Sequence, residues 1–114
     1  MNEKYYWLNN DSRLFLERGY LEEGETPEKR IRQISRHAEK ILNKEGFAKK
    51  FEDYMSRGWY SLASPIWANY GKKRGLPISC FGSYIDDTME EILYTVSEVG
   101  MMSKMGGGTS AYFG

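Results

Sequence analysis

The sequence has few of the residues that mark several common classes of protein. Among its 114 residues there is one cysteine, Cys80, and one histidine, His37. A single cysteine cannot form an internal disulfide, which argues against a small secreted fold held by disulfides and leaves either a buried core thiol or a reactive one. His37 has no acidic or sulfur-bearing residue at the helical spacing of a metal site, so we expect it to be structural and expect no bound metal.

Net charge and long apolar runs are also missing. Sixteen basic residues balance sixteen acidic ones, so no long-range field would steer the chain to nucleic acid or to an anionic membrane surface. The opening segment lacks a basic flank followed by an apolar core, and no apolar run approaches the roughly 20 residues of a membrane span. We therefore expect a cytoplasmic protein. Its 40% hydrophobic and 15% aromatic content is enough for a folded core.

Three helices are predicted in the N-terminal half. Polar cap residues at 9–12 precede a short first helix that Gly19 would end. The second helix begins with Thr26 as its cap and Pro27 at its first position, and Gly46 is the expected terminator. Its apolar stripe consists of Ile31, Ile34, Ala38, Ile41 and Leu42.

The opposite face of this second helix is basic and carries Arg30, Arg32, Arg36, Lys40 and Lys44. Glutamates interrupt the row, and amphipathic helices normally show a charged face to solvent, so we interpret it as a solvated face rather than a docking surface. A third helix, ended by Gly58, follows with core-facing residues at helical spacing, which are Phe47, Phe51, Tyr54 and Met55.

The pattern changes after Trp59, where no sustained helical stripe follows. Pro65 is expected to hold Ser64 in an extended or turn conformation, because a proline disfavours the helical region for the residue before it. Residues 71–75 read Gly-Lys-Lys-Arg-Gly and predict a basic turn.

A strand is predicted over residues 76–85, with Ser79 and Cys80 on opposite faces unless the strand bulges. Asp87 is the expected N-cap of a following amphipathic helix. The apolar stripe of this helix consists of Met89, Ile92, Leu93, Val96, Val99 and Gly100.

Three consecutive glycines at 106–108 end this helix and exceed what one C-cap requires. Such a run is typical of a turn, a flexible tether or a backbone that approaches a ligand closely. Residues from Ser110 onward then predict a second strand. A strand pair with one crossover helix is half of a parallel sheet, so we expect a truncated or split chain.

Four motifs in order carry a resemblance to an enzyme family. They are Leu62-Ala63-Ser64-Pro65, then Leu76-Pro77-Ile78-Ser79-Cys80-Phe81, then Asp86-Asp87 at the start of a helix, then Met102-Ser103-Lys104-Met105-Gly106-Gly107-Gly108. The chain resembles the large, catalytic subunit of class I ribonucleotide reductases, most clearly over residues 47–114. The resemblance implies an α-helical N-terminal region at 1–58. It also implies that residues 59–114 form the first strand, helix and second strand of a ten-stranded α/β barrel, so that this chain is mainly α.

The resemblance also implies the chemistry of the site. In this family a thiyl radical activates the ribose, and two further thiols deliver two electrons and become a disulfide. Cys80 matches one member of this reducing pair, whose partner would need a Cα separation of roughly 4.4–6.8 Å. Substrate contacts are implied for Ser64, Ser79 and Gly108, since hydroxyls and close backbone amides suit ribose and phosphate oxygens.

Further ligands and partners are implied in the same way. Asp87 and Lys104 match contacts to a deoxynucleotide effector, or ATP, at a specificity site on the dimer interface, where a helix N-terminus and a carboxylate order sugar and phosphate. The expected partners are the rest of the large subunit, a second copy of it, and a small subunit whose metal centre generates the radical. No cofactor is expected on this chain itself.

The sequence also departs from the family pattern. There is no room before Trp59 for the cone domain that reads ATP against dATP, and the radical cysteine and the second redox cysteine would lie beyond Gly114. We therefore expect the chain alone to be inactive, although its family is that of ribonucleoside-diphosphate reductases. A split gene, an intein-interrupted gene and an incomplete sequence all remain open, and so does the choice between di- and triphosphate substrates.

One alternative of a different kind also remains open. The chain could be a small, non-catalytic helical binding module, in which Cys80 belongs to the core, Asp87 only caps a helix, and the basic helix face docks a partner. This alternative predicts a cooperative monomer that does not bind nucleotides.

Overall fold

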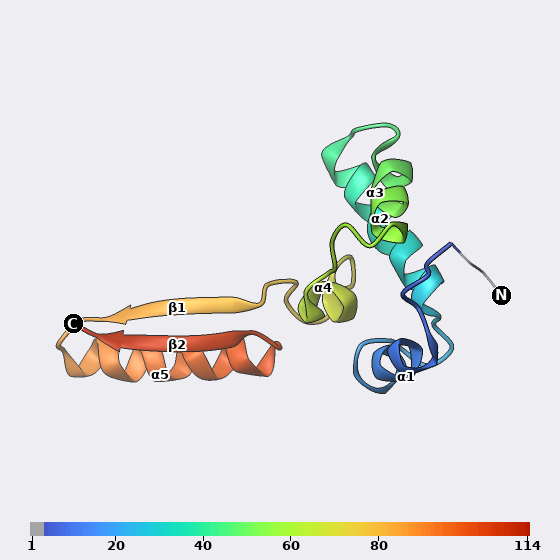
Figure 1. Ribbon diagram of the computed structural model, residues 1–114. Helices are drawn as coiled ribbons and strands as arrows, with labels where there is room; N and C mark the ends of the chain where they lie inside the picture. Colours follow the sequence, from blue (N-terminus) through green and yellow to red (C-terminus); the bar gives the residue numbers. More distant parts are fainter. Residues whose placement is uncertain (1–3) are drawn as a thin grey trace.

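The computed structural model describes residues 4–114, so the first three residues of the opening segment lie outside the described part. The elements in chain order are α1 (Asn10–Gly19), α2 (Pro27–Leu42), α3 (Phe47–Ser56), α4 (Ser64–Asn69), β1 (Cys80–Ile85), α5 (Met89–Lys104) and β2 (Gly108–Phe113). Figure 1 shows two parts, a helical body formed by α1–α4 and a sheet arm formed by β1, α5 and β2. The radius of gyration is 17.7 Å, compared with about 13 Å for a compact domain of about 100 residues.

The helical body contains the core. Buried side chains from the opening segment and from four helices meet there, and they are Tyr5, Leu8, Leu16, Ile31, Met55 and Trp67. The Trp7 indole donates a hydrogen bond to the Met55 carbonyl at 2.9 Å, which ties the opening segment to the end of α3. None of the helices within residues 4–114 is long and apolar enough to cross a membrane.

Helix α2 begins as predicted and ends differently. The Thr26 hydroxyl accepts from the Lys29 amide at 3.3 Å, and Pro27 occupies the first turn, which confirms the predicted start. Its end is set by Asn43 in the left-handed conformation (φ 49°), so Gly46 was the wrong terminator. Asparagine tolerates this conformation better than most residues, and Gly46 instead precedes α3.

The two faces of α2 also differ from the prediction. Ile31 and Ile34 are buried, whereas Ile41 is 63% exposed and Leu42 56% exposed. The predicted stripe is therefore too long, because the core meets only the first half of the helix. Arg30 was assigned to the solvated basic face but is 2% exposed, because its guanidinium donates a buried hydrogen bond to the Trp67 carbonyl.

Helix α4 corrects the expected conformation of Ser64. Ala63 takes the extended backbone (φ −65°, ψ 150°) and Ser64 begins the helix, with Pro65 in its first turn. A proline in this position removes no intrahelical hydrogen bond, so Pro65 starts the helix instead of preventing it. Glycines with positive φ at Gly71 and Gly75 then bound the predicted turn.

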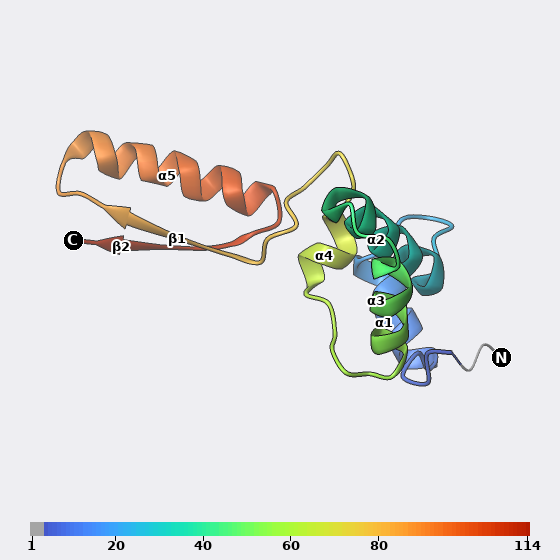
Figure 2. The same ribbon diagram turned by 90° about the horizontal axis from the view of Figure 1, so that it is seen from above.

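The sheet arm contains the predicted parallel pair. Cys80 pairs with Gly108 and Ile85 with Phe113, with α5 as the crossover. Figures 1 and 2 show α5 along one face of the pair, while the other face is open. Within residues 4–114 the sheet has two strands, so the structure contains the start of a parallel α/β sheet and no closed barrel.

The limits of both strands differ from the prediction. β1 begins at Cys80 rather than at Leu76, because the Leu76 amide donates to the Met105 carbonyl at 3.1 Å instead of entering the ladder. β2 begins at Gly108, two positions before the expected Ser110.

Helix α5 corrects two further predictions. Its N-cap is Thr88, whose hydroxyl accepts from the Glu91 amide at 3.2 Å, so Asp87 lies one residue before the cap. Thr95 is buried at the sheet-facing side, whereas four members of the predicted stripe are exposed, namely Met89, Leu93, Val96 and Gly100. The pattern was read as one stripe because α5 carries apolar residues on more than one side.

Candidate functional site

The candidate site lies where the sheet arm joins the helical body. Cys80 is the first residue of β1, and its thiol is free and exposed. The side chains of β1 alternate, with Phe81 partly buried toward α5 and Cys80 on the open face. Its Sγ lies 3.7 Å from the Ser79 hydroxyl. The two side chains are therefore neighbours and not on opposite faces, and Ser79 lies one residue before the start of β1.

Backbone contacts at this point explain the glycines. The Gly108 amide donates to the Ser79 carbonyl at 2.7 Å, and a Cβ on Gly108 would lie 3.1 Å from that oxygen. A Cβ on Gly107 would overlap the Phe81 ring, and Gly106 has φ 93°. Each glycine therefore has a structural reason of its own, and the close approach at Gly108 brings two strands together beside Cys80.

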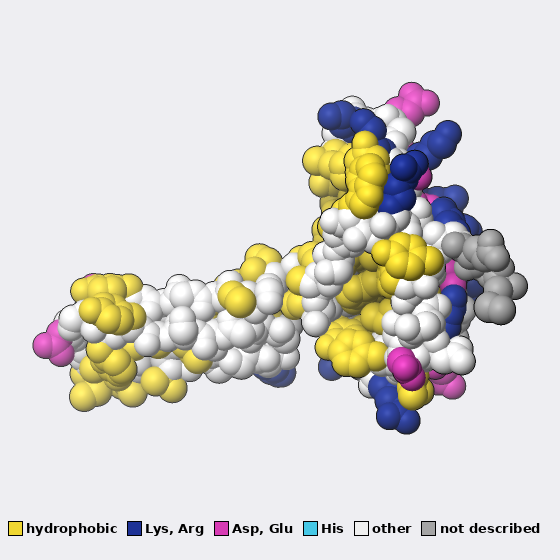
Figure 3. All heavy atoms as spheres, in the orientation of Figure 1, with side chains coloured by type: hydrophobic (Ala, Val, Ile, Leu, Met, Phe, Trp, Pro, Cys, Tyr) yellow, Lys and Arg dark blue, Asp and Glu magenta, His cyan; other side chains and the backbone are white. Residues whose placement is uncertain are grey.

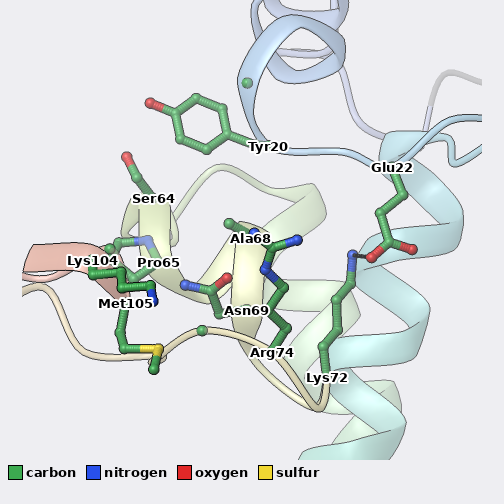
Figure 4. Close-up of a pocket in the computed structure, with 13 residues that line it drawn as sticks. Tyr20, Glu22, Ser64, Pro65, Ala68, Asn69, Lys72, Arg74, Lys104 and Met105 are labelled. Carbon is green, nitrogen blue, oxygen red and sulfur yellow. Dashed lines mark ion pairs between the residues drawn. The ribbon is translucent and has the colours of Figure 1, made fainter. Parts of the chain in front are cut away.

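A hollow of about 340 Å³ lies next to this junction (Figure 4). We call it the Ser64–Lys104 hollow, since it brings these two predicted site residues together although they are far apart in the chain. Its other lining residues are Gly19, Tyr20, Glu22, Pro65, Ala68, Asn69, Lys72, Arg74, Gly75, Met105 and Gly106. Cys80 does not line it.

The hollow has a basic lining. Lys72 is neutralised by Glu22 at 3.2 Å and by Glu25 at 3.3 Å, while Arg74 and Lys104 add two further cations. The Asn69 amide donates to the Leu76 carbonyl at 2.9 Å, which fastens the end of α4 to the segment that enters β1. Together with the Ser64 hydroxyl, this lining offers donors to an anionic ligand.

The two predicted effector contacts are not brought together. Asp87 precedes α5 and Lys104 is its last residue. A helix of 16 residues is roughly 24 Å long. Within one chain, Asp87 and Lys104 therefore belong to opposite ends of the sheet arm.

Arg30 is a residue near the site that the sequence did not single out. Its Nε donates to the Trp67 carbonyl at 2.7 Å, and its Nη2 donates to the carbonyls of Ile66 (3.1 Å) and Tyr70 (2.7 Å). Burial lowers the pKa of Arg30, while Glu25 and Glu22 act in the opposite direction. One signal was available, because Arg30 lies four residues before Ile34 and so on the same side of the helix.

His37 lies beside the residues that directly follow α4. Its ring packs edge-to-face on Tyr70 with centroids 5.1 Å apart, and it lies close to Gly71. Among residues 4–114, no three His, Cys, Asp or Glu side chains come together in a way that could hold a metal ion. His37 therefore belongs to the packing of the turn after α4.

Comparison with known proteins identifies the fold. The family model of the ribonucleotide reductase all-alpha domain matches residues 6–75. The chain belongs to the ribonucleotide reductase large-subunit family. Its structure superposes on the class Id ribonucleotide reductase alpha subunit of Actinobacillus ureae with a TM-score of 0.92 and 68% identity, over 95% of this chain and 21% of that one. The match includes the sheet arm as well as the helical body.

Viral reductases are also similar in sequence. The large subunit of ribonucleoside-diphosphate reductase from Invertebrate iridescent virus 3 is 37% identical over 94 residues, which is 82% of this chain and 15% of the relative. The corresponding subunit of Invertebrate iridescent virus 6 is 43% identical over 68 residues, or 59% of this chain and 7% of the relative. The chain thus spans about a fifth or less of the proteins it matches.

Proposed function

We propose that this chain is the N-terminal portion of a ribonucleotide reductase large subunit and works in the reduction of ribonucleotides to deoxyribonucleotides. The observation that carries the proposal is the similarity to the class Id alpha subunit over 95% of the chain. This similarity favours an enzyme over a small helical binding module, because it extends through the sheet arm and its cysteine. The names of the viral relatives favour diphosphate substrates.

In this proposal Cys80 is one of two reducing thiols. The 2′-hydroxyl of the ribose leaves as water, and the two thiols supply two electrons and two protons as they become a disulfide. The second thiol belongs to a part of the subunit outside this chain, and so does the cysteine that carries the radical. An exposed thiol on the open face of a strand suits this role, since it must meet both the substrate and its partner sulfur.

The remaining predicted residues are proposed to bind ligands. Ser64, Ser79 and Gly108 would contact the substrate. Asp87 and Lys104 would hold the effector at a dimer interface. Because Asp87 and Lys104 lie at opposite ends of α5, one effector would meet both only where α5 helices of two copies lie side by side.

The proposed assembly contains two large subunits and a small subunit that generates the radical, and it works in the cytoplasm. The radical supplied by the small subunit's metal centre starts the reaction. The residues of this chain then position the ribose and deliver electrons from Cys80. The isolated 114-residue chain has one thiol and is expected to be inactive.

A chimeric subunit tests the proposal. Residues 1–114 replace the matching segment of the Actinobacillus ureae alpha subunit, and reduction of a ribonucleoside diphosphate is measured with that enzyme's small subunit and a thiol reductant. We expect turnover by the chimera and loss of multiple turnover in Cys80→Ser, with substrate binding nearly unchanged. Ser61→Ala, in an exposed segment before α4, is the control and should retain activity. Full turnover by Cys80→Ser would end the assignment of Cys80.

A further inference from the structure

Helix α4 connects the helical body to the candidate site. It has six residues, begins at Ser64 and ends at Asn69, whose side chain is bonded to the Leu76 carbonyl. A helix this short is not stable by itself in water, so its position depends on what holds it. Figure 2 shows α4 between α2 and the segment that leads to the sheet arm.

Arg30 holds α4 from the side of the helical body. Its guanidinium bonds three carbonyls at the end of α4, those of Ile66, Trp67 and Tyr70, at 2.7–3.1 Å. The Ile66 carbonyl also accepts from the Tyr70 amide at 3.2 Å. The last carbonyls of a helix generally have no intrahelical partner, and a cation near them is favourable. With three acceptors in different directions, the planar group fixes both the position and the rotation of the helix end.

Burying an arginine to hold a helix in place carries a large desolvation free energy. Its side chain is 2% exposed, and no carboxylate makes a hydrogen bond to it within residues 4–114; Gln33 Oε1 accepts from Nη1 at 3.3 Å. Burying a cation without an ion-pair partner is unfavourable, and an apolar side chain could fill such a space at lower cost. What an apolar side chain cannot provide is directional contact with three carbonyls.

We propose that Arg30 is a positioning residue that holds α4 so that the Ser64 hydroxyl meets the substrate. The inference rests on the proposed function of Ser64 as a substrate contact. Arg30 does not touch the substrate, and it acts through the short helix whose other end carries Ser64. Asn69 completes the connection by fixing the same helix to the strand entrance beside Cys80.

A double-mutant cycle in the chimeric subunit tests the inference. Arg30→Lys keeps the charge and most of the stem but cannot contact three carbonyls, so KM for the ribonucleotide should rise about threefold to tenfold with kcat nearly unchanged. In a Ser64→Ala background the same change should leave KM within about twofold of the background value. A loss of packing alone would act equally in both backgrounds.

Two further variants complete the experiment. Gln33→Ala removes the one side chain within residues 4–114 that accepts from Arg30 and leaves the guanidinium in place. It should therefore raise KM by less than about threefold and only when Ser64 is present. It keeps the cycle interpretable if Arg30→Lys fails to fold. Arg36→Lys, an exposed position on the same helix, is the matched control and should change neither parameter.

The outcomes separate the inference from the proposed function. If Ser64→Ala raises KM and neither Arg30→Lys nor Gln33→Ala does, the inference is wrong and the substrate contact stands. Equal KM increases in both backgrounds would also overturn the inference. If Ser64→Ala leaves KM unchanged, the substrate contact and the positioning role fail together.

Discussion

Two isoleucines on α2 provide a direct test of where the core lies. Ile31 is fully buried and Ile41 is 63% exposed, although both lie on the apolar stripe that the sequence predicts. Ile31→Ala removes three carbon atoms from a packed site, which costs about 2.4 kcal/mol at about 0.8 kcal/mol per buried methylene. The cavity left behind raises the expected loss to about 3–4 kcal/mol.

Ile41→Ala is the matched control. An exposed isoleucine loses little contact when truncated, and alanine has the higher helix propensity, so the free energy of unfolding should change by less than about 0.5 kcal/mol. Urea unfolding followed by tryptophan fluorescence measures both variants, since Trp7 and Trp67 lie at the same core. Similar losses at the two positions would refute the placement of the core against the first half of α2.

Two further predictions concern glycine and pH. Gly107→Ala would force a Cβ into the Phe81 ring and should destabilise the sheet arm by about 1–3 kcal/mol. A Cβ on Gly82 would lie 4.0 Å from its nearest neighbour, so Gly82→Ala should be near neutral. Hydrogen exchange of the backbone amides in β1 and α5 measures both variants, and equal losses of protection would contradict the prediction. The hydrogen bond from Arg13 holds the pKa of Glu28 below its ordinary value. This pair therefore stabilises the fold above the unfolded pKa, and the contribution is lost as pH falls through the folded pKa. Urea midpoints from about pH 6 to about pH 3 should fall less steeply in Arg13→Gln than in the unsubstituted chain, and equal slopes would contradict this assignment.

Local signals in the sequence predicted most of the helix starts and the parallel strand pair. Thr26 and Pro27 mark the start of α2 because a cap hydroxyl and a proline act within one turn of the helix. α1 ends at Gly19, as predicted, although its C-cap is Tyr20. The strand, helix and strand of the sheet arm were predictable because periodicity and glycine position are written into consecutive residues.

The predictions that were wrong concern residues whose structure depends on contacts with parts of the chain far away in the sequence. Arg30 was assigned to solvent, and its three carbonyl acceptors are more than 35 positions away, in and just after α4. Ser64 was expected to be extended or in a turn, yet α4 forms where Arg30 holds its end and Trp67 enters the core. A helix of six residues has too little periodicity to be recognised without those contacts.

The candidate site, too, could be predicted only in part from the sequence. The sequence placed Cys80 within a strand and the glycines at 106–108 at the end of a helix, whereas the structure starts β1 at Cys80 and pairs this residue with Gly108 at the start of β2. The Ser64–Lys104 hollow could not be predicted, because its lining comes from α1, α4, the basic turn and the end of α5. The functional roles of these residues stay predictions, and the chimeric subunit is where they can be measured.

The sheet arm shows how an apolar pattern can exceed the burial available to it. Figure 3 shows hydrophobic side chains gathered at the end of the arm far from the helical body, and Tyr84 and Tyr112 are both more than 60% exposed, with ring centroids 6.0 Å apart. Strands of parallel sheets are normally covered on both faces, which explains why the open face carries large side chains such as Tyr84 and Tyr112. In the proposed large subunit the remaining strands and the second copy would cover these surfaces. The stripe predicted for α5 was therefore too wide for the sheet arm alone, since Leu93 is 60% exposed and Val96 is 65% exposed.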